Sequence, residues 1–235
     1  MTFPTPEGTA ETAVSTAGTS HLITLPASIV DTDYVLILMA IGSTAATINA
    51  LTGWQLNLNE NVANGLKIMR WNGAGVPTNP TFVTTAATRS ASIAWRISGA
   101  DTSFSPQIAT TATGTSATPD PPASATPAFG TQDYLFITFF GAAGEEADDD
   151  TWSDTPPTNY LPSPPLQKSC GTAGTNLGGL IAAAYRQLNT GSAEDPGTFA
   201  KDVSAAWRAQ TIILAPTPPP TAVYPINTLQ PRIPT

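Results

Sequence analysis

Few residues in this chain have side chains suited to catalysis. His21 is the only histidine and Cys170 the only cysteine, and no Gly-x-Ser-x-Gly or other nucleophile pattern accompanies them. One of each also cannot supply the four ligands of a structural zinc site. The glycines from Gly171 to Gly179 lack the Lys-Ser/Thr that follows a phosphate-binding loop. We therefore expect no enzymatic activity, no catalytic residue and no cofactor, and a Cys170–His21 pair is the one nucleophilic arrangement left open.

One acidic segment, EEADDDTWSD at residues 145–154, carries six carboxylates in ten residues. Carboxylate oxygens are the ligands that Ca²⁺ prefers, so a calcium site formed by Glu145, Glu146, Asp148, Asp149 and Asp150 is one interpretation. The segment lacks the Asp-x-Asp-x-Asp-Gly spacing of a calcium loop. We favour the other interpretation, a solvated acidic loop.

Tryptophans near predicted loops are the candidates for binding a ligand. Aromatic rings stack on sugars or plug a core, and Trp54, Trp71 and Trp152 stand near turn residues. Core or turn packing is the interpretation we favour for each.

Composition and the absence of targeting patterns argue against nucleic acid and membranes as partners. Among the 235 residues, 41% are hydrophobic and 11% charged, and the 9 basic against 17 acidic residues give a net charge of −8. A chain with so few Lys and Arg has no basic stripe to follow a phosphate backbone, so we expect no nucleic-acid binding. The N-terminus lacks a signal-peptide pattern and no apolar run reaches membrane-spanning length, so we expect synthesis in the cytoplasm and no membrane contact.

Short apolar runs bounded by turn residues predict β-strands throughout. No window has a helical period with caps, and the Ala-rich stretch Gly178–Gln187 is predicted as a strand. The predicted strands are His21–Leu25, Tyr34–Ile41, Leu66–Trp71, Thr81–Thr85, Ser92–Ser98, Tyr134–Phe140, Leu180–Arg186, Thr198–Lys201 and Ser204–Ala215.

Several short motifs occur twice in the same order, which predicts an internal duplication. Ala94-Trp-Arg96 matches Ala206-Trp-Arg208, and Asp33-Tyr34 matches Asp133-Tyr134. Gly18-Thr-Ser matches Gly114-Thr-Ser, Gly65-Leu66 matches Gly179-Leu180, and Thr81-Phe82 matches Thr198-Phe199. The pseudo-repeats extend over residues 8–101 and 105–215.

Alternation along the strands predicts which side chains form the core. In Ser92–Ser98, Ile93, Trp95 and Ile97 share one face, so Trp95 is expected to point inward and Arg96 outward. The matched Trp207 and Arg208 are expected to do the same, with Tyr34 and Tyr134 in the core. Tyr34–Ile41 is apolar on both faces and needs cover on both sides. We expect loops of the same chain to supply it, with a neighbouring subunit as the alternative.

The whole pattern predicts an all-β protein with one jelly-roll-like antiparallel sandwich over residues 1–215, built from two duplicated halves. Two tandem small sandwiches are the alternative. Residues 216–235, PTPPPTAVYPINTLQPRIPT, are too rich in proline for a helix or a central strand and predict an extended C-terminal arm.

The order Asp33-Tyr34, Gly53-Trp54, Thr81-Phe82, Ala94-Trp95 and Gly99-Ala-Asp101, followed by its second copy, resembles a diffuse family of β-sandwich proteins from the structural modules of tailed phages. The resemblance implies a virion component such as a head decoration protein or a tail or fibre subunit. It implies other virion proteins and further copies of the chain as partners, and no catalytic residue.

Two expectations about partners follow. The arm is expected to dock on a neighbouring subunit through Tyr224, Ile226, Leu229 and Ile233, with folding back on its own sandwich as the alternative. The other candidate function is a carbohydrate-binding or adhesion module that recognises a host or surface glycan through the loop tryptophans.

Overall fold

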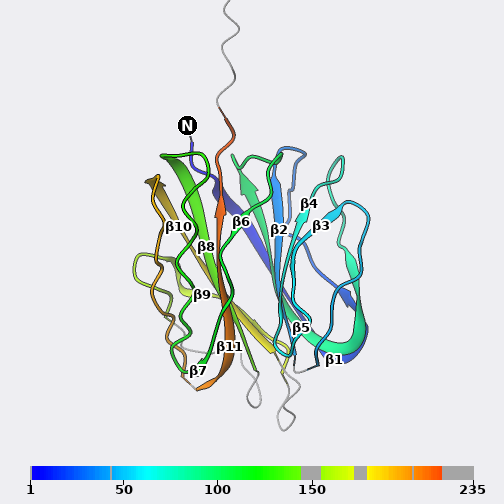
Figure 1. Ribbon diagram of the computed structural model, residues 1–235. Helices are drawn as coiled ribbons and strands as arrows, with labels where there is room; N and C mark the ends of the chain where they lie inside the picture. The colour runs from blue at the N-terminus through cyan, green and yellow to red at the C-terminus, as the bar shows by residue number, and fades with distance from the viewer. Residues whose placement is uncertain (1, 43, 144–154, 172–178, 203, 219–235) are drawn as a thin grey trace, which may run out of the picture.

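The computed structural model describes residues 2–42, 44–143, 155–171, 179–202 and 204–218. Within these ranges the chain forms eleven β-strands and no helix. The strands form two antiparallel sheets that pack face to face (Figure 1). The prediction of an all-β antiparallel sandwich is confirmed.

The first sheet has five strands in the order β1-β5-β2-β4-β3. Their bounds are β1 (Thr5–Leu22), β2 (Tyr34–Ile41), β3 (Trp54–Asn59), β4 (Leu66–Trp71) and β5 (Thr81–Ser98). Strands β2 and β4 coincide with predicted strands, and β5 joins two predicted strands into one. The sequence reasoning missed β3 and all but the end of β1.

The second sheet has six strands in the order β6-β11-β8-β10-β9, with β7 also paired to β11. Their bounds are β6 (Gln107–Ile108), β7 (Ala112–Ser116), β8 (Gln132–Ala143), β9 (Leu161–Ser169), β10 (Gly179–Thr190) and β11 (Ala205–Leu214). Strand β10 covers the Ala-rich stretch that was predicted as a strand. The predicted strand Thr198–Lys201 is wrong, because only Ala200 makes an isolated bridge there, to Thr155.

The two sheets share one strand order. Strands β1, β5, β2, β4 and β3 have the same sequence of neighbours as β7, β11, β8, β10 and β9. Each sheet comes from one continuous stretch of chain, and the described strands cross between sheets once, from β5 to β6. This connectivity corrects the jelly-roll-like part of the prediction, because a jelly roll crosses repeatedly between its sheets.

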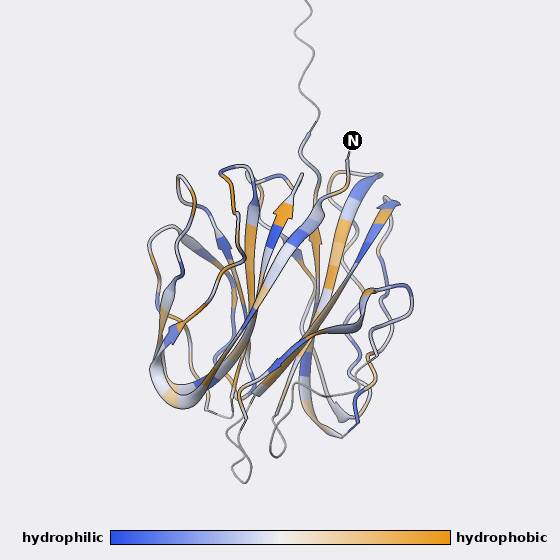
Figure 2. Cartoon of the chain, turned by 180° about the vertical axis from the view of Figure 1, so that it is seen from behind, coloured by the Kyte–Doolittle hydropathy of each residue, from blue (hydrophilic) through white to orange (hydrophobic). Residues whose placement is uncertain are grey.

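The central core lies between the two sheets. Its largest side chain is Trp95 on β5, which is fully buried and packs edge-on against Tyr185 of β10 with ring centroids 6.0 Å apart. Leu36 and Leu38 of β2 face Ile137 and Phe139 of β8 in the same cluster. In Figure 2 apolar stretches (orange) run along central strands of both sheets.

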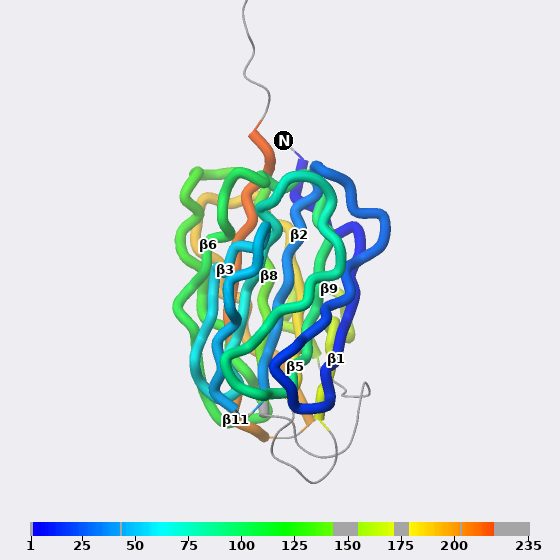
Figure 3. Tube along the Cα trace, turned by 90° about the vertical axis from the view of Figure 1, so that its right-hand side faces the viewer, coloured from blue at the N-terminus to red at the C-terminus, as the bar shows by residue number. Residues whose placement is uncertain are grey.

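The outer face of each sheet is also covered. On the first sheet, Val35, Ile37 and Met39 pack against residues of the segments that follow β1 and β2, including Ile23 and Ile48. Figure 3 looks onto this side of the molecule, with connecting segments in front of β2. Strand Tyr34–Ile41 is therefore covered on both faces within the chain, by the second sheet on one face and by loops on the other. The prediction of cover from the same chain is confirmed, although loops supply only half of it. Tyr160 and Phe199 help cover the outer face of the second sheet in the same way.

The predicted orientation of the repeated motifs is wrong in the second half. Trp95 and Tyr34 lie between the sheets, as expected. Trp207 and Tyr134 are also buried, but they lie on the outer face of the second sheet. Side chains alternate along a strand, so Arg208 points toward the first sheet rather than outward. The matched residues therefore share burial but not orientation.

Candidate functional site

The two candidate nucleophilic residues belong to different sheets and have separate partners. His21 at the end of β1 is fully buried, with Nδ1 2.8 Å from Ser90 Oγ and Nε2 3.1 Å from Thr84 Oγ1. Cys170, just after β9, is buried beside Gly179. Burial raises the pKa of the Cys170 thiol to about 11, so this side chain is a neutral thiol at pH 7 rather than a nucleophilic thiolate.

Several predicted site residues lie outside the described residues. These are the acidic residues Glu145, Glu146, Asp148, Asp149 and Asp150, the tryptophan Trp152, and the arm residues Tyr224, Ile226, Leu229 and Ile233. Elsewhere, in the described part of the chain, no group of three His, Cys, Asp or Glu side chains is placed to hold a metal ion.

Trp54 and Trp71, at the ends of β3 and β4, pack against other side chains over the outer face of the first sheet. Trp54 contacts Trp71 and Phe82 edge-on, with centroids 5.5 Å and 5.6 Å apart. The indole of Trp71 donates a hydrogen bond to the carbonyl of Gly75 at 2.9 Å, and its ring passes so close to Gly53 that a Cβ there would lie 2.2 Å from it. These rings act as plugs over the first sheet, and neither is arranged as an open platform for a sugar.

A polar clamp joins the two sheets along one side of the sandwich. Glu60, directly after β3, accepts hydrogen bonds from Arg208 Nε at 2.9 Å, Thr111 Oγ1 at 2.8 Å and the Leu66 amide at 2.8 Å. Burial raises the pKa of the Glu60 carboxyl, but these three donors outweigh it and lower the pKa overall. The clamp therefore holds a carboxylate and a guanidinium in a structural ion pair.

Lys67 of β4 anchors the same hairpin from the other side of the sheet. Its side chain is fully buried, and its ammonium donates to the carbonyl of Ala46 at 2.8 Å and to the carbonyl of Glu60. Burial lowers the pKa of Lys67 to about 8, although the nearby Glu60 carboxylate opposes the shift. Lys67 thus ties the turn after β3 to the segment after β2.

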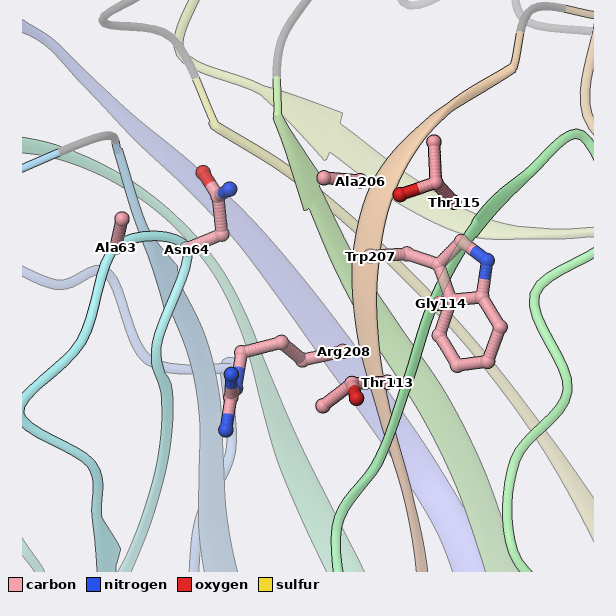
Figure 4. A pocket seen from close by; sticks show the side chains of 8 residues that line it. All are labelled: Ala63, Asn64, Thr113, Gly114, Thr115, Ala206, Trp207 and Arg208. Atoms are coloured by element: carbon pink, nitrogen blue, oxygen red, sulfur yellow. The ribbon is translucent and has the colours of Figure 1, made fainter.

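A shallow polar hollow lies between this turn and strands β7 and β11 (Figure 4). It has a volume of about 300 Å³, and Asn64, Thr113, Trp207 and Arg208 line it. Asn64 adopts a left-handed backbone with φ of 55°, and its Oδ1 is buried without a hydrogen-bond partner among the described residues. The hollow therefore has two polar side chains on one side, Asn64 of the turn and Arg208 of β11, while the Trp207 ring points to the other side of β11 (Figure 4).

A second, apolar hollow lies where the C-terminal arm begins. Phe104 and Phe129 are 47% and 41% exposed, and their rings meet edge-on at 4.9 Å. The residues that line this hollow are Asp101, Phe104, Phe129, Gln132, Ala215, Pro216 and Pro218. We call it the aromatic hollow. Two large exposed rings, 25 positions apart in the sequence, meet there.

The base of the arm is fixed to the domain at this hollow. Ala100 and Pro216 form an antiparallel bridge, the Asp101 amide donates to the Ala215 carbonyl at 2.9 Å, and the Thr217 amide donates to the Gly99 carbonyl at 2.8 Å. Residues up to Thr217 are therefore held by backbone hydrogen bonds. The sequence analysis started the arm at Pro216 and did not single out Phe104 or Phe129, because they lie 25 positions apart in the Ser- and Pro-rich linker.

No family model, curated protein or solved structure matches this chain. In the described ranges no helix is long and apolar enough to cross a membrane.

Proposed function

We propose that this protein is a non-enzymatic structural subunit of a bacteriophage virion, either a head decoration protein or a tail or fibre subunit. It binds neighbouring virion subunits and further copies of itself, and it is made in the host cytoplasm. The observation that carries the proposal is the aromatic hollow at the fixed base of a proline-rich arm, because exposed apolar groups of this kind mark protein interaction sites.

The ionisable groups around the clamp support a structural role. Glu60, Lys67 and Arg208 make hydrogen bonds within the domain, and Asp33 pairs with Arg96 at 2.6 Å. Such groups hold strands and loops together, because their donors and acceptors pair within the domain.

We also propose that the two sheets arose by duplication of one β unit, with repeats over residues 8–101 and 105–215. The shared strand order supports this, since two unrelated five-stranded sheets have many other possible orders. The reversed faces of Trp207 and Tyr134 mean that the repeats differ in register.

The experiment that tests the virion proposal is mass spectrometry of purified phage particles. We expect the chain at a fixed stoichiometry relative to the major capsid protein, retained after washing in high salt. An abundant host protein from the same lysate serves as the control for carry-over. Absence of the chain from washed particles, or a level no higher than that of the host protein, would refute the proposal.

Glycan binding is the second candidate, and the polar hollow is the observation that favours it. Its volume of about 300 Å³ is at the lower end for small-ligand sites, and Asn64, Thr113 and Arg208 supply polar groups in its wall of the kind that orient a bound sugar. A glycan array probed with the parent protein and with Asn64→Gly tests it. Glycine suits the left-handed backbone at this position, so a loss of signal would report on the side chain, whereas equal signals would exclude this site.

A further inference from the structure

The aromatic hollow is small and mostly apolar. Its volume is about 80 Å³, far below the roughly 300–1,000 Å³ of small-molecule sites. It therefore fits a single side chain of another polypeptide better than a free ligand. Aromatic rings and prolines, which form most of its wall, are the groups that line sites for proline-rich segments in the polyproline conformation.

The chain's own arm is poorly placed to fill the hollow. Ala215, Pro216 and Pro218 already form part of the wall. Ala215 and Thr217 are hydrogen-bonded to Gly99, Ala100 and Asp101. Three prolines follow at positions 218–220. Proline fixes φ near −65° and favours an extended path, so this sequence opposes the reversal that would bring the next residues back to the hollow.

The remaining arm has the length to reach a neighbouring molecule. Residues 219–235 would span on the order of 50 Å in a polyproline conformation, at about 3.1 Å per residue. A domain of this size has a radius of gyration of about 17 Å. The arm also carries apolar residues between its prolines, including Tyr224 and Ile226, which suit an aromatic hollow.

We propose that the aromatic hollow is the docking site for residues 219–235 of a second copy of this chain, so that copies assemble by exchanging arms. Phe104 and Phe129 are the receiving side chains, and Tyr224 and Ile226 are the anchors. The inference deepens the proposed function, since it rests on the chain being an assembling structural subunit and names the contact through which copies join.

The main experiment is complementation between two variants. Variant one ends after Pro218 and keeps the hollow and the backbone hydrogen bonds at the base of the arm. Variant two is Phe104→Ser with Phe129→Ser and keeps the arm. We expect the parent to be oligomeric by light scattering coupled to gel filtration, each variant alone to be monomeric, and an equimolar mixture to form a complex of the two.

Controls separate docking from folding. Val83→Ser removes a valine that is 45% exposed on β5 and should leave assembly of the parent unchanged. Circular dichroism and the denaturation midpoint of each variant check that the sandwich is intact. Since both phenylalanines are more than 40% exposed, the double variant is expected to fold.

A peptide measurement tests the same contact independently. A labelled synthetic peptide of residues 219–235 is titrated with the chain that ends after Pro218, and fluorescence anisotropy reports binding. We expect binding at least 10-fold weaker when the peptide carries Tyr224→Ser and Ile226→Ser, or when the domain carries Phe104→Ser and Phe129→Ser.

Three results would overturn the inference. The first is a parent that stays monomeric at all concentrations while the peptide binds, which would place the arm on its own domain. The second is a parent whose assembly survives loss of the arm or of the two phenylalanines. The third is a peptide that does not bind. None of these bears on whether the chain occurs in purified particles, so failure of the exchange and failure of the virion proposal are distinguishable.

Discussion

Replacing Trp95 with alanine tests the packing between the two sheets most directly. Trp95 is fully buried in the central core and contacts Tyr185 edge-on. Deleting a buried aromatic side chain costs about 3–5 kcal/mol, from lost burial and from the cavity left behind. Whole domains have free energies of unfolding of about 5–15 kcal/mol. We therefore expect the Trp95→Ala variant to lose a large share of this free energy and still to unfold in a measurable transition.

A matched variant separates the ring from its polar atom. The indole Nε1 of Trp95 has no hydrogen-bond partner among the described residues, and a buried unpaired donor costs roughly 1–3 kcal/mol. Trp95→Phe removes that donor and keeps an aromatic ring, so we expect it to cost less than about 1.5 kcal/mol. Trp207 Nε1 donates to Ser116 Oγ at 3.0 Å, so Trp207→Phe loses a hydrogen bond and should cost more than Trp95→Phe.

Urea denaturation followed by circular dichroism measures these differences, with the slope m checked for constancy. Trp207→Ala should also cost about 3–5 kcal/mol. A free energy of unfolding for Trp95→Ala within about 0.5 kcal/mol of the parent would show that this tryptophan does not fill the core. A larger cost for Trp95→Phe than for Trp207→Phe would refute the role given to the unpaired indole N–H.

The remaining predictions concern pH and close packing. Burial lowers the pKa of His21 from 6.5, partly offset by a backbone hydrogen bond with Gly18. The unfolded state therefore binds the His21 proton more readily than the folded state, so the free energy of unfolding of the parent should fall as the pH drops below 6.5. In His21→Gln this contribution to the fall should be missing when denaturation midpoints are compared at pH 7.5, 6 and 5. Burial lowers the pKa of Lys67 from 10.5 to about 8, so the parent should gain stability relative to Lys67→Met as the pH rises from 8 to 10.5; parallel curves would contradict this. Gly114→Ala should cost about 1–3 kcal/mol in thermal melts, because its Cβ would lie 2.5 Å from the Trp207 ring. The matched Gly18→Ala, whose Cβ has its nearest atom at 4.0 Å, should stay within about 0.5 kcal/mol, and equal effects would show that the two glycines have the same role.

The central strands were predictable from sequence and the edge strands were not. Strands β2 and β4 are buried along nearly their whole length, so they appear as apolar runs with clear ends. Strand β1 is an edge strand of mostly Thr, Ala, Ser and Gly, and β9 is an edge strand with three prolines. Proline is tolerated at edges because one side of the strand forms no ladder hydrogen bonds, and this is the composition that sequence reasoning assigns to loops.

Strand β3 carried a signal that was missed. Trp54, Leu56 and Leu58 alternate with polar residues, as in a strand with one buried face. A register shift between Leu56 and Leu58 then changes the face, so Trp54 and Leu56 pack on the outer side while Leu58 packs against the central core. A bulge of this kind depends on the partner strand, and the sequence of β3 alone does not show it.

The two hollows required tertiary structure. The polar hollow joins a turn of the first sheet to strands of the second, and the clamp between Glu60 and Arg208 closes a separation of 148 positions. Such a pair has no local signature, because neither a helix period nor strand alternation connects its members. The aromatic hollow likewise depends on the chain passing from Ala215 along Gly99 to Asp101.

The reversed faces in the second sheet have a physical explanation in the double cover of the central strands. A shift of one residue moves every side chain of a strand to the opposite face, which is costly when only one face is buried. In β2 and β8 both faces are buried, one between the sheets and one under loops, so either face meets an apolar layer. Tyr34 and Tyr134 could therefore diverge in orientation while both stayed buried, at 2% and 0% exposure. In a strand covered on both sides, a repeated motif predicts burial, and only the packed structure decides which layer receives the side chain.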